Sequence, residues 1–248
     1  MEDDSTGARR GGPQEIPRPR DVKKGQPAPW SVLDQTERLF SLDSLRSIFG
    51  SRGPGAPSPQ GEDPAKGSAA VLAAFWEEED DLAVLLTRRR WNLRTHKGEV
   101  SFPGGARDSS DPDLVTTALR EAHEEVGLGP SEVHIVGELD HLTTVSSDRF
   151  IVPYVGVLER PPARLNPHES EVDAILRVSV TELLADQTYR QEIWHGGDRV
   201  AYGRRIVYDQ RPINFFELHG DTIWGATATM LTQLLAIATQ TRDPGTET

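Results

Sequence analysis

Apolar residues occur in short runs along the chain, and Gly- and Pro-rich segments separate these runs. The runs AAVLAAFW at 69–76 and LAVLLT at 82–87 predict two strands joined by an acidic turn. Further strands are predicted around 134–139, 150–158, 206–208 and 213–218. Helical spacing predicts helices at 112–126, 179–185 and 222–239. This order predicts an α+β fold, with a mixed β-sheet between helices in an α/β/α sandwich.

The same pattern divides the chain into four parts. Residues 1–29 are rich in Gly, Pro, Arg and Asp without apolar periodicity, which predicts a disordered N-terminal arm. Residues 30–67 hold a short helical segment, predicted to end at Gly50, and then a Gly/Pro linker. The main domain is predicted over 68–240, with a flexible tail at 241–248.

Composition and charge narrow the classes of function. The chain has 248 residues and no cysteine, which excludes disulfides, zinc–thiolate sites and catalytic thiols. No apolar run is long enough to span a bilayer and no signal peptide is evident, so we expect a cytoplasmic protein without a membrane partner. The formal net charge of -12 disfavours nucleic acid as a partner. A phosphate-bearing substrate would need local cations or bound metal ions to offset this charge.

Three glutamates share one face of the helix predicted at 112–126. Glu121, Glu124 and Glu125 stand at i, i+3 and i+4. Asp111 and Pro112 suit the helix start, and Gly127 suits its end. A solvated, charged helix face is the ordinary interpretation of such a pattern. The alternative is a metal site, because converging carboxylates are the oxygen ligands that Mg²⁺ and Mn²⁺ prefer.

A basic cluster precedes this helix. The segment 85–105 contains no acid before Glu99 and carries six basic residues: Arg88, Arg89, Arg90, Arg94, His96 and Lys97. A solvated strand edge is one interpretation, because basic residues commonly protect strand edges. In a chain of net charge -12, we favour a binding site for several phosphate groups.

The stretch 104–128 resembles the Nudix box, Gly-x5-Glu-x7-Arg-Glu-U-x-Glu-Glu-x-Gly-U, where U is a bulky apolar residue. The matching residues are Gly105, Arg120, Glu121, Glu124, Glu125, Gly127 and Leu128. Three features depart from it: Asp111 in place of the first glutamate, the small Ala122, and one additional residue before Arg120.

This resemblance implies a Nudix fold and hydrolysis of a nucleoside diphosphate linked to another group. It further implies that the three glutamates bind Mg²⁺ or Mn²⁺, that Gly104 or Gly105 contributes to the pyrophosphate site, and that Arg120 orients a glutamate. Glu171 is the first candidate for the general base and Glu169 the second.

The preceding segment resembles the coenzyme A pyrophosphatase branch of that family. Leu85, Leu86, Thr87, Arg89, Arg94, Gly98 and Phe102–Gly105 match its signature. LDHLTTVSS, VPYVGVL and IWGATATML resemble the same branch, so the resemblance spans about residues 69–235. It implies cleavage of coenzyme A or acyl-CoA to 3′,5′-ADP and (acyl) 4′-phosphopantetheine, with Arg89, Arg94 and Lys97 binding phosphates.

Three alternatives remain at this point. In the first, the substrate is another nucleoside diphosphate derivative, such as an NDP-sugar, a dinucleoside polyphosphate or an oxidised nucleotide. In the second, the chain is a Nudix-fold ligand-binding module without catalysis. In the third, its Arg-rich segment 9–24 binds DNA or a protein. A homodimer is compatible with any of these.

Overall fold

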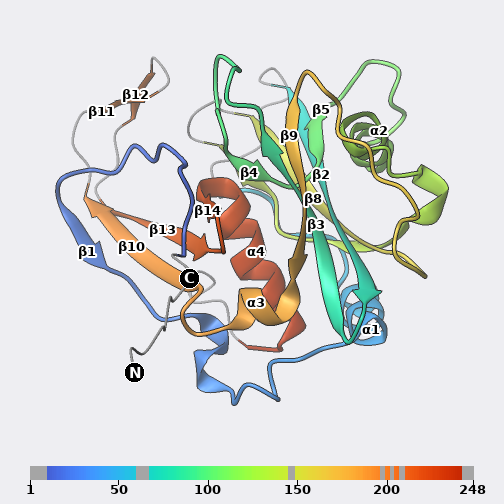
Figure 1. Ribbon diagram of the computed structural model, residues 1–248, viewed down its shortest axis with the longest axis horizontal. Helices are drawn as coiled ribbons and strands as arrows, with labels where there is room; N and C mark the ends of the chain where they lie inside the picture. The colour runs from blue at the N-terminus through green and yellow to red at the C-terminus, as the bar shows by residue number, and fades with distance from the viewer. Residues whose placement is uncertain are drawn as a thin grey trace, which may run out of the picture.

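The computed structural model describes residues 10–59, 67–144, 149–195, 199–201, 204–206 and 210–241 (Figure 1). The helices are η1 Pro29–Val32, α1 Leu42–Arg52, α2 Leu114–Val126, η3 Pro130–Glu132, α3 Val180–Leu184 and α4 Gly225–Ala238. The strands are β1 Val22–Lys24, β2 Ser68–Glu78, β3 Asp81–Arg89, β4 Val100–Ser101, β5 Gly104–Ala106, β6 His134–Glu138, β7 Leu142–Thr143, β8 Phe150–Val157, β9 Val172–Ser179, β10 Tyr189–His195, β11 Arg199–Ala201, β12 Arg204–Ile206, β13 Gln210–Glu217 and β14 Thr222–Trp224.

An eight-stranded mixed sheet forms the centre of the structure. Its main order is β4-β3-β2-β8-β6, with β5 paired to β2, β7 to β8 and β9 to β3. Strands β2 and β8 run parallel from Ser68↔Phe150 to Phe75↔Val157, and the other described pairs of this sheet are antiparallel. Strand β2 is buried along nearly its whole length, as its apolar run predicts for a central strand.

The two faces of this sheet pack against different helices, because successive side chains of a strand point to opposite faces. Leu72 and Trp76 of β2 belong to the apolar cluster that includes Ala118 and Ala122 of α2. Phe75 belongs to the larger cluster with side chains of α1 and α4. The α/β/α arrangement with a mixed sheet is therefore confirmed, with α2 on one side of the sheet and α4 on the other (Figure 1).

A second sheet, which the apolar pattern predicts only in part, covers α4 on its far side (Figure 1). It has the order β1-β10-β13-β14, and each pair in it is antiparallel. Trp30 is fully buried here, with its ring 5.5 Å from that of Tyr189 and 6.2 Å from that of Phe216. The segment before the main domain is thus joined to the core by aromatic packing.

The prediction of a disordered arm is wrong for residues 10–29. Val22–Lys24 pair with Glu192–Trp194 of β10, and the Arg18 Nη2 atom lies 2.8 Å from a carboxylate oxygen of Glu192. Gln14 is buried, although it is polar. Main-chain pairing and polar contacts fix this segment, and neither produces the apolar periodicity on which the prediction relied. Residues 1–9 of the predicted arm lie outside the described residues.

Two helix boundaries also differ from prediction. Helix α1 passes through Gly50 and is followed by Gly53, whose φ is 79°. An interior glycine costs a helix only about 1 kcal/mol, so Gly50 does not end it. Residues 222–224 were predicted to begin the last helix, but they pair with β13 and α4 begins at Gly225.

Most of the remaining predicted elements lie within the described residues, and two fall largely outside them. Strands predicted around 134–139, 150–158 and 213–218 are confirmed as β6, β8 and β13, and the short helix at 179–185 is confirmed as α3. The strand predicted at 206–208 and the tail at 241–248 fall largely outside the described residues. Within the described part of the chain, no helix has the length and apolar character needed to cross a membrane.

Candidate active site

Helix α2 places its glutamates at the border between sheet and solvent. Asp113 caps its N-terminus by accepting a hydrogen bond of 2.7 Å from the backbone N–H of Thr116. Gly127 ends it in the left-handed region, with φ 75°. Ala118 and Ala122 are fully buried against the sheet, and these small side chains let the helix axis approach the strands closely. The reduced size of Ala122, a departure from the Nudix pattern, therefore coincides with tight packing.

Glu121 lies directly over the backbone of β5. A Cβ atom placed on Gly105 would lie 2.4 Å from the Glu121 carboxyl carbon, so a side chain at position 105 would force this carboxylate to move. Arg120 Nη1 lies 3.0 Å from Glu121 Oε1. Burial raises the pKa of Glu121, and the Arg120 charge opposes this shift. The Gly-Gly sequence thus provides the space that this carboxylate occupies.

Glu125 is the most buried carboxylate of the three, with 6% of the residue exposed. Its Oε2 atom accepts a long hydrogen bond of 3.4 Å from the backbone N–H of Gly104. Burial raises the pKa of Glu125 to about 7, and the charges of Glu121 and Glu171 act in the same direction, while Arg89 opposes them. The structure therefore brings Glu121, Glu125 and Glu171 close enough to interact electrostatically.

Glu124 does not join the other two glutamates in this conformation. Its side chain is 57% exposed, and its Oε2 lies 2.9 Å from Nη1 of Arg120. Among the described residues, no group of three or more acidic or histidine side chains is assembled as a metal site. The prediction that all three glutamates converge on an ion therefore stays a prediction: in this conformation Glu121 and Glu125 interact electrostatically, and Glu124 is paired with Arg120.

Asp111 holds Arg120 in place, which corrects its predicted role as the helix cap. Its carboxylate is buried and accepts hydrogen bonds of 3.0 Å from both Nε and Nη2 of Arg120. Thr117 Oγ1 and the backbone N–H of Asp108 donate two more, each at 2.9 Å. The Arg120 guanidinium is the main reason that the pKa of Asp111 lies well below its usual range. Arg120 in turn contacts Glu121 and Glu124, as the predicted orienting role requires.

A loop over residues 166–171 docks on the C-terminal end of α2. The backbone N–H groups of Asn166 and His168 donate to the carbonyls of Val126 and Glu125, at 2.9 and 2.8 Å. These bonds satisfy carbonyls that a helix end leaves unpaired. The loop also joins β3, because Arg90 N–H donates to the Glu171 carbonyl at 2.9 Å. Glu171 is thereby placed beside the glutamates of α2, with its side chain exposed.

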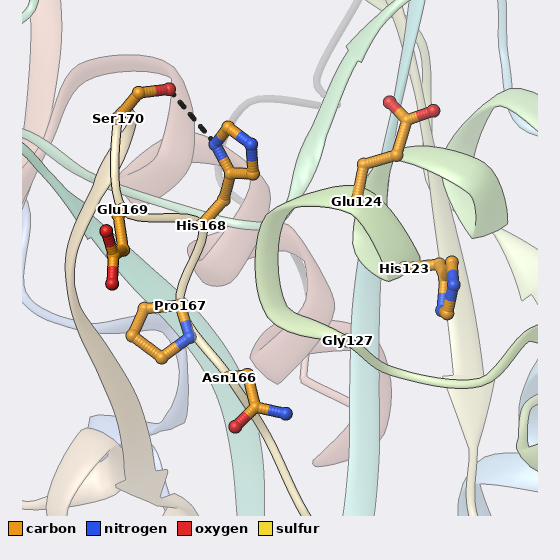
Figure 2. Close-up of a pocket in the computed structure, with 8 residues that line it drawn as sticks. All are labelled: His123, Glu124, Gly127, Asn166, Pro167, His168, Glu169 and Ser170. Carbon is orange, nitrogen blue, oxygen red and sulfur yellow. Dashed lines mark hydrogen bonds between the residues drawn. The ribbon is translucent and has the colours of Figure 1, made fainter.

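An open groove of about 600 Å³ lies between the side chains of this loop and those at the C-terminal end of α2 (Figure 2). His123, Glu124 and Gly127 line one side, and residues 166–170 line the other. Figure 2 shows the His168 ring beside the Ser170 hydroxyl, and their atoms lie 3.1 Å apart. Glu124 is the one of the three glutamates that lines this groove. The groove therefore lies next to the site of Glu121 and Glu125 and does not contain it.

The residues of the basic cluster have different surroundings. Arg88 is bound to carboxylate oxygens of Asp173 and Asp221, each at 2.9 Å, and has a structural role. Arg89 acts electrostatically on Glu125, and the pairing of β3 with β9 shifts register between Arg88 and Arg89. Its Nε atom is buried and has no hydrogen-bond partner among the described residues. The Arg89 guanidinium thus lies near Glu125 with one of its donors unpaired.

Residues 90–98 form a turn-rich segment, here called the basic loop. Arg94 and Lys97 are exposed on it. No hydrogen bond or ion pair joins either side chain to a described residue, and the structure does not place them against the α2 glutamates. Gly98 has φ 63°, and the ring of Trp91 packs where its Cβ would be, within 2.3 Å. Trp91 therefore packs within the loop rather than in the core.

The donor set fits a divalent cation. Two carboxylates, one of them buried with only a single long hydrogen bond, lie against the backbone of Gly104 and Gly105. Burying the Glu125 carboxylate is costly, Arg89 offsets only part of that cost, and an ion of charge +2 would offset the rest. Sequence reasoning missed the docking of residues 166–171 and the anchoring role of Asp111. The anchoring pairs Asp111, which lies before α2, with Arg120 inside the helix, and their opposite charges were visible in the sequence. The docking uses main-chain atoms, which carry no sequence signal.

Comparisons with known proteins agree with this geometry. The model of the NUDIX domain matches residues 66–195, which is more than half of the chain. Nudix hydrolase 22, chloroplastic, of Arabidopsis thaliana is 37% identical over 180 residues, which cover 69% of this chain and 55% of that protein. Nudix hydrolase 15, mitochondrial, of the same plant is 36% identical, over 68% of this chain and 58% of that protein. The chain thus spans little more than half the length of these plant relatives.

A bacterial relative is covered more fully. The Uncharacterized Nudix hydrolase NudL of Citrobacter koseri is 34% identical over 181 residues, which cover 72% of this chain and 86% of that protein. The region that the NUDIX domain model matches, residues 66–195, includes β2 to β10. It therefore includes both α2 and the loop that carries Glu171. On this evidence, the chain belongs to the Nudix hydrolase family.

Proposed function

We propose that this protein is a divalent-metal-dependent pyrophosphohydrolase that cleaves coenzyme A or acyl-CoA to 3′,5′-ADP and (acyl) 4′-phosphopantetheine. The observation that carries the proposal is the placement of Glu121 and Glu125 over the Gly104–Gly105 backbone, with Arg89 beside them. Family membership supports hydrolysis of a diphosphate. The choice of coenzyme A rests on the branch signature and on the cations of the basic loop, Arg94 and Lys97.

In this proposal, Glu121, Glu124 and Glu125 would hold Mg²⁺ or Mn²⁺, which would require Glu124 to leave Arg120. Such an ion would supply positive charge to the diphosphate and would make the attacking water more acidic. The chain's own groups do the rest. Arg89 binds a phosphate oxygen, the Gly104–Gly105 backbone leaves room for the diphosphate, and Arg120 orients Glu121. Glu171 accepts the proton of the attacking water, with Glu169 as second candidate.

Coenzyme A suits the charge distribution of the site. It carries a diphosphate and a 3′-phosphate, and each phosphate group gains from charge-assisted hydrogen bonds. Arg89 serves the diphosphate, and Arg94 and Lys97 of the basic loop serve the remaining phosphate. The thiol end of the substrate is distant from the bond that breaks, so the lack of cysteine in the chain does not conflict with this substrate.

The test is product analysis after incubation of the full chain with coenzyme A and Mn²⁺ or Mg²⁺. We expect 3′,5′-ADP and 4′-phosphopantetheine in equal amounts, and loss of both products when the metal is chelated. The substitution Glu125→Gln should lower kcat/KM by about 100-fold or more, because it removes a charged metal ligand without changing its size. Glu77→Gln, at an exposed position of β2, is the matched control and should leave turnover unchanged.

The same experiment separates the alternatives. Faster turnover of an NDP-sugar, a dinucleoside polyphosphate or an oxidised nucleotide would assign another substrate to the same site. Tight binding of coenzyme A without products, with either metal, would indicate a ligand-binding module. Undiminished turnover in Glu125→Gln would contradict the assignment of the metal ligands.

A further inference from the structure

The N-terminal arm reaches the basic loop through one buried side chain. Gln14 is 8% exposed, and its amide nitrogen donates to the Gly98 carbonyl at 3.1 Å and to Asp221 Oδ1 at 2.7 Å. Its amide oxygen accepts from the backbone N–H of Thr222 at 2.9 Å. Both ends of the amide are therefore used. One side chain links the arm, the basic loop and the turn before β14.

The backbone of the arm fits tightly against that turn. A Cβ atom on Gly12 would lie 2.5 Å from the Gly220 carbonyl oxygen and 2.6 Å from the Asp221 Cα atom. The Gly12 N–H donates to Thr222 Oγ1 at 3.0 Å, and the Gly11 N–H donates to the Leu218 carbonyl at 2.7 Å. The contacts of Gly11 and Gly12 thus hold the backbone before Gln14 in place. A residue that positions another segment needs such an anchored backbone.

The far end of this network is the strand that carries Arg89. Asp221, which accepts from Gln14, also binds Arg88 Nη1 at 2.9 Å. Arg88 precedes Arg89 on β3, and the Arg89 N–H donates to the Glu99 carbonyl at 2.9 Å. Gln14 therefore supports the basic loop directly at Gly98, and through Asp221 it supports the strand from which the loop departs.

We propose that Gln14 is a positioning residue for anion binding: it holds the basic loop so that Arg94 and Lys97 are presented to the phosphates of the substrate. This inference rests on the proposed function. Lys97 is adjacent in sequence to Gly98, whose carbonyl Gln14 binds. Loss of that hydrogen bond should therefore make the part of the loop that carries Arg94 and Lys97 more mobile. Gln14 touches neither substrate nor reacting atoms in this scheme, and it acts through the loop.

The test uses the full chain with Gln14→Met, which fills similar space without hydrogen bonds. Gln26→Ala, at an exposed position of the same arm, is the matched control. We expect tryptic cleavage after Arg94 and Lys97 to be about three- to tenfold faster in Gln14→Met, with the first cut located by mass spectrometry. The Kd for inorganic pyrophosphate and the KM for coenzyme A should rise by about the same factor, with kcat changed less than about twofold.

A combined substitution isolates the path of the effect. In a background that lacks both loop cations, Arg94→Ala/Lys97→Ala, Gln14→Met should change KM by less than about twofold, because substitutions that act through the same groups are not additive. Should Gln14→Met not fold, Gln14→Asn keeps the amide on a shorter side chain and should show smaller changes of the same kind. A lower melting temperature with unchanged loop cleavage, pyrophosphate Kd and KM would overturn the inference, since it indicates a structural role alone.

The two proposals fail in different ways. If wild-type protein does not cleave coenzyme A, the proposed function fails. Loop cleavage and the pyrophosphate Kd then still decide the role of Gln14. If the wild type is active and Gln14→Met is fully additive with Arg94→Ala/Lys97→Ala, the inference about Gln14 is overturned and the proposed function stands.

Discussion

Glu125 combines burial with two negatively charged neighbours, Glu121 and Glu171. Such an environment favours the neutral carboxylic acid when no cation is bound. A divalent ion reverses that preference, because it stabilises the carboxylate directly. The strength of metal binding at this site and the protonation of Glu125 are therefore coupled.

This coupling gives a pH dependence of stability. The pKa of Glu125 rises from an ordinary 4.5 to about 7 in the folded protein. With metal chelated, its contribution is fully present below about pH 4.5 and is lost as the pH rises through about 7. We expect up to about 3 kcal/mol of the free energy of unfolding to depend on pH in this way. Thermal unfolding in EDTA from pH 5 to 8 measures it.

Glu125→Gln provides the control, because its amide does not titrate and its melting temperature should vary less with pH. Mn²⁺ added at pH 8 should raise the melting temperature of the wild type and not of the variant. Identical pH profiles for the two proteins would show that Glu125 does not titrate in this range.

At the scale of elements, the contact between β5 and α2 sets the position of the carboxylates. Gly105→Ala should displace the Glu121 carboxylate, since the added Cβ would lie 2.4 Å from its carboxyl carbon. We expect kcat/KM for coenzyme A to fall by about tenfold or more, as for loss of a group that orients a metal ligand. Gly50→Ala in α1, where nothing lies within 4 Å, should leave activity unchanged and raise stability by up to about 1 kcal/mol. Equal activity of the two variants would argue against a role for Gly105.

The elements that sequence predicts are those with a strong apolar pattern. Strands β2, β3 and β8 and helices α2 and α4 carry long apolar runs or helical periodicity, and each is found close to its predicted place. Strands β1, β9 and β10 escaped prediction. Only Val172 and Val178 of β9 are buried, and β1 is three residues long, so neither strand has an apolar run that distinguishes it from a loop.

The candidate site divides in a similar way. Fixed spacing within one helix predicted Glu121, Glu124 and Glu125 as a set, and in the structure Glu125 interacts electrostatically with Glu121 while Glu124 is paired with Arg120. The different surroundings of Arg88 and Arg89 could not be predicted, because β3 shifts register between these two residues in its pairing with β9. The contact of Gln14 with Gly98 spans 84 positions and depends on tertiary structure, so no local pattern reveals it.

At the scale of the whole molecule, an aromatic cluster joins the N-terminal segment to the second sheet. Trp30 is fully buried, and its Nε1 donates to the Leu184 carbonyl at 3.2 Å. Trp30→Ala should lower the free energy of unfolding by about 3–5 kcal/mol, measured by chemical denaturation, because it leaves a large cavity. Val32→Ala, at a position that is 80% exposed, should change it by less than about 0.5 kcal/mol. A small effect of Trp30→Ala would show that the segment is dispensable for stability.

The attachment of residues 166–171 to α2 has a consequence for how this protein can change. The anchoring bonds come from the amides of Asn166 and His168, so the identity of the side chains at 168–170 is not what keeps the loop in place. Those side chains line the groove beside Glu124. Mutations can therefore alter the lining of the groove while the loop's attachment is preserved. A library randomised at these three positions would explore new ligands on an unchanged scaffold.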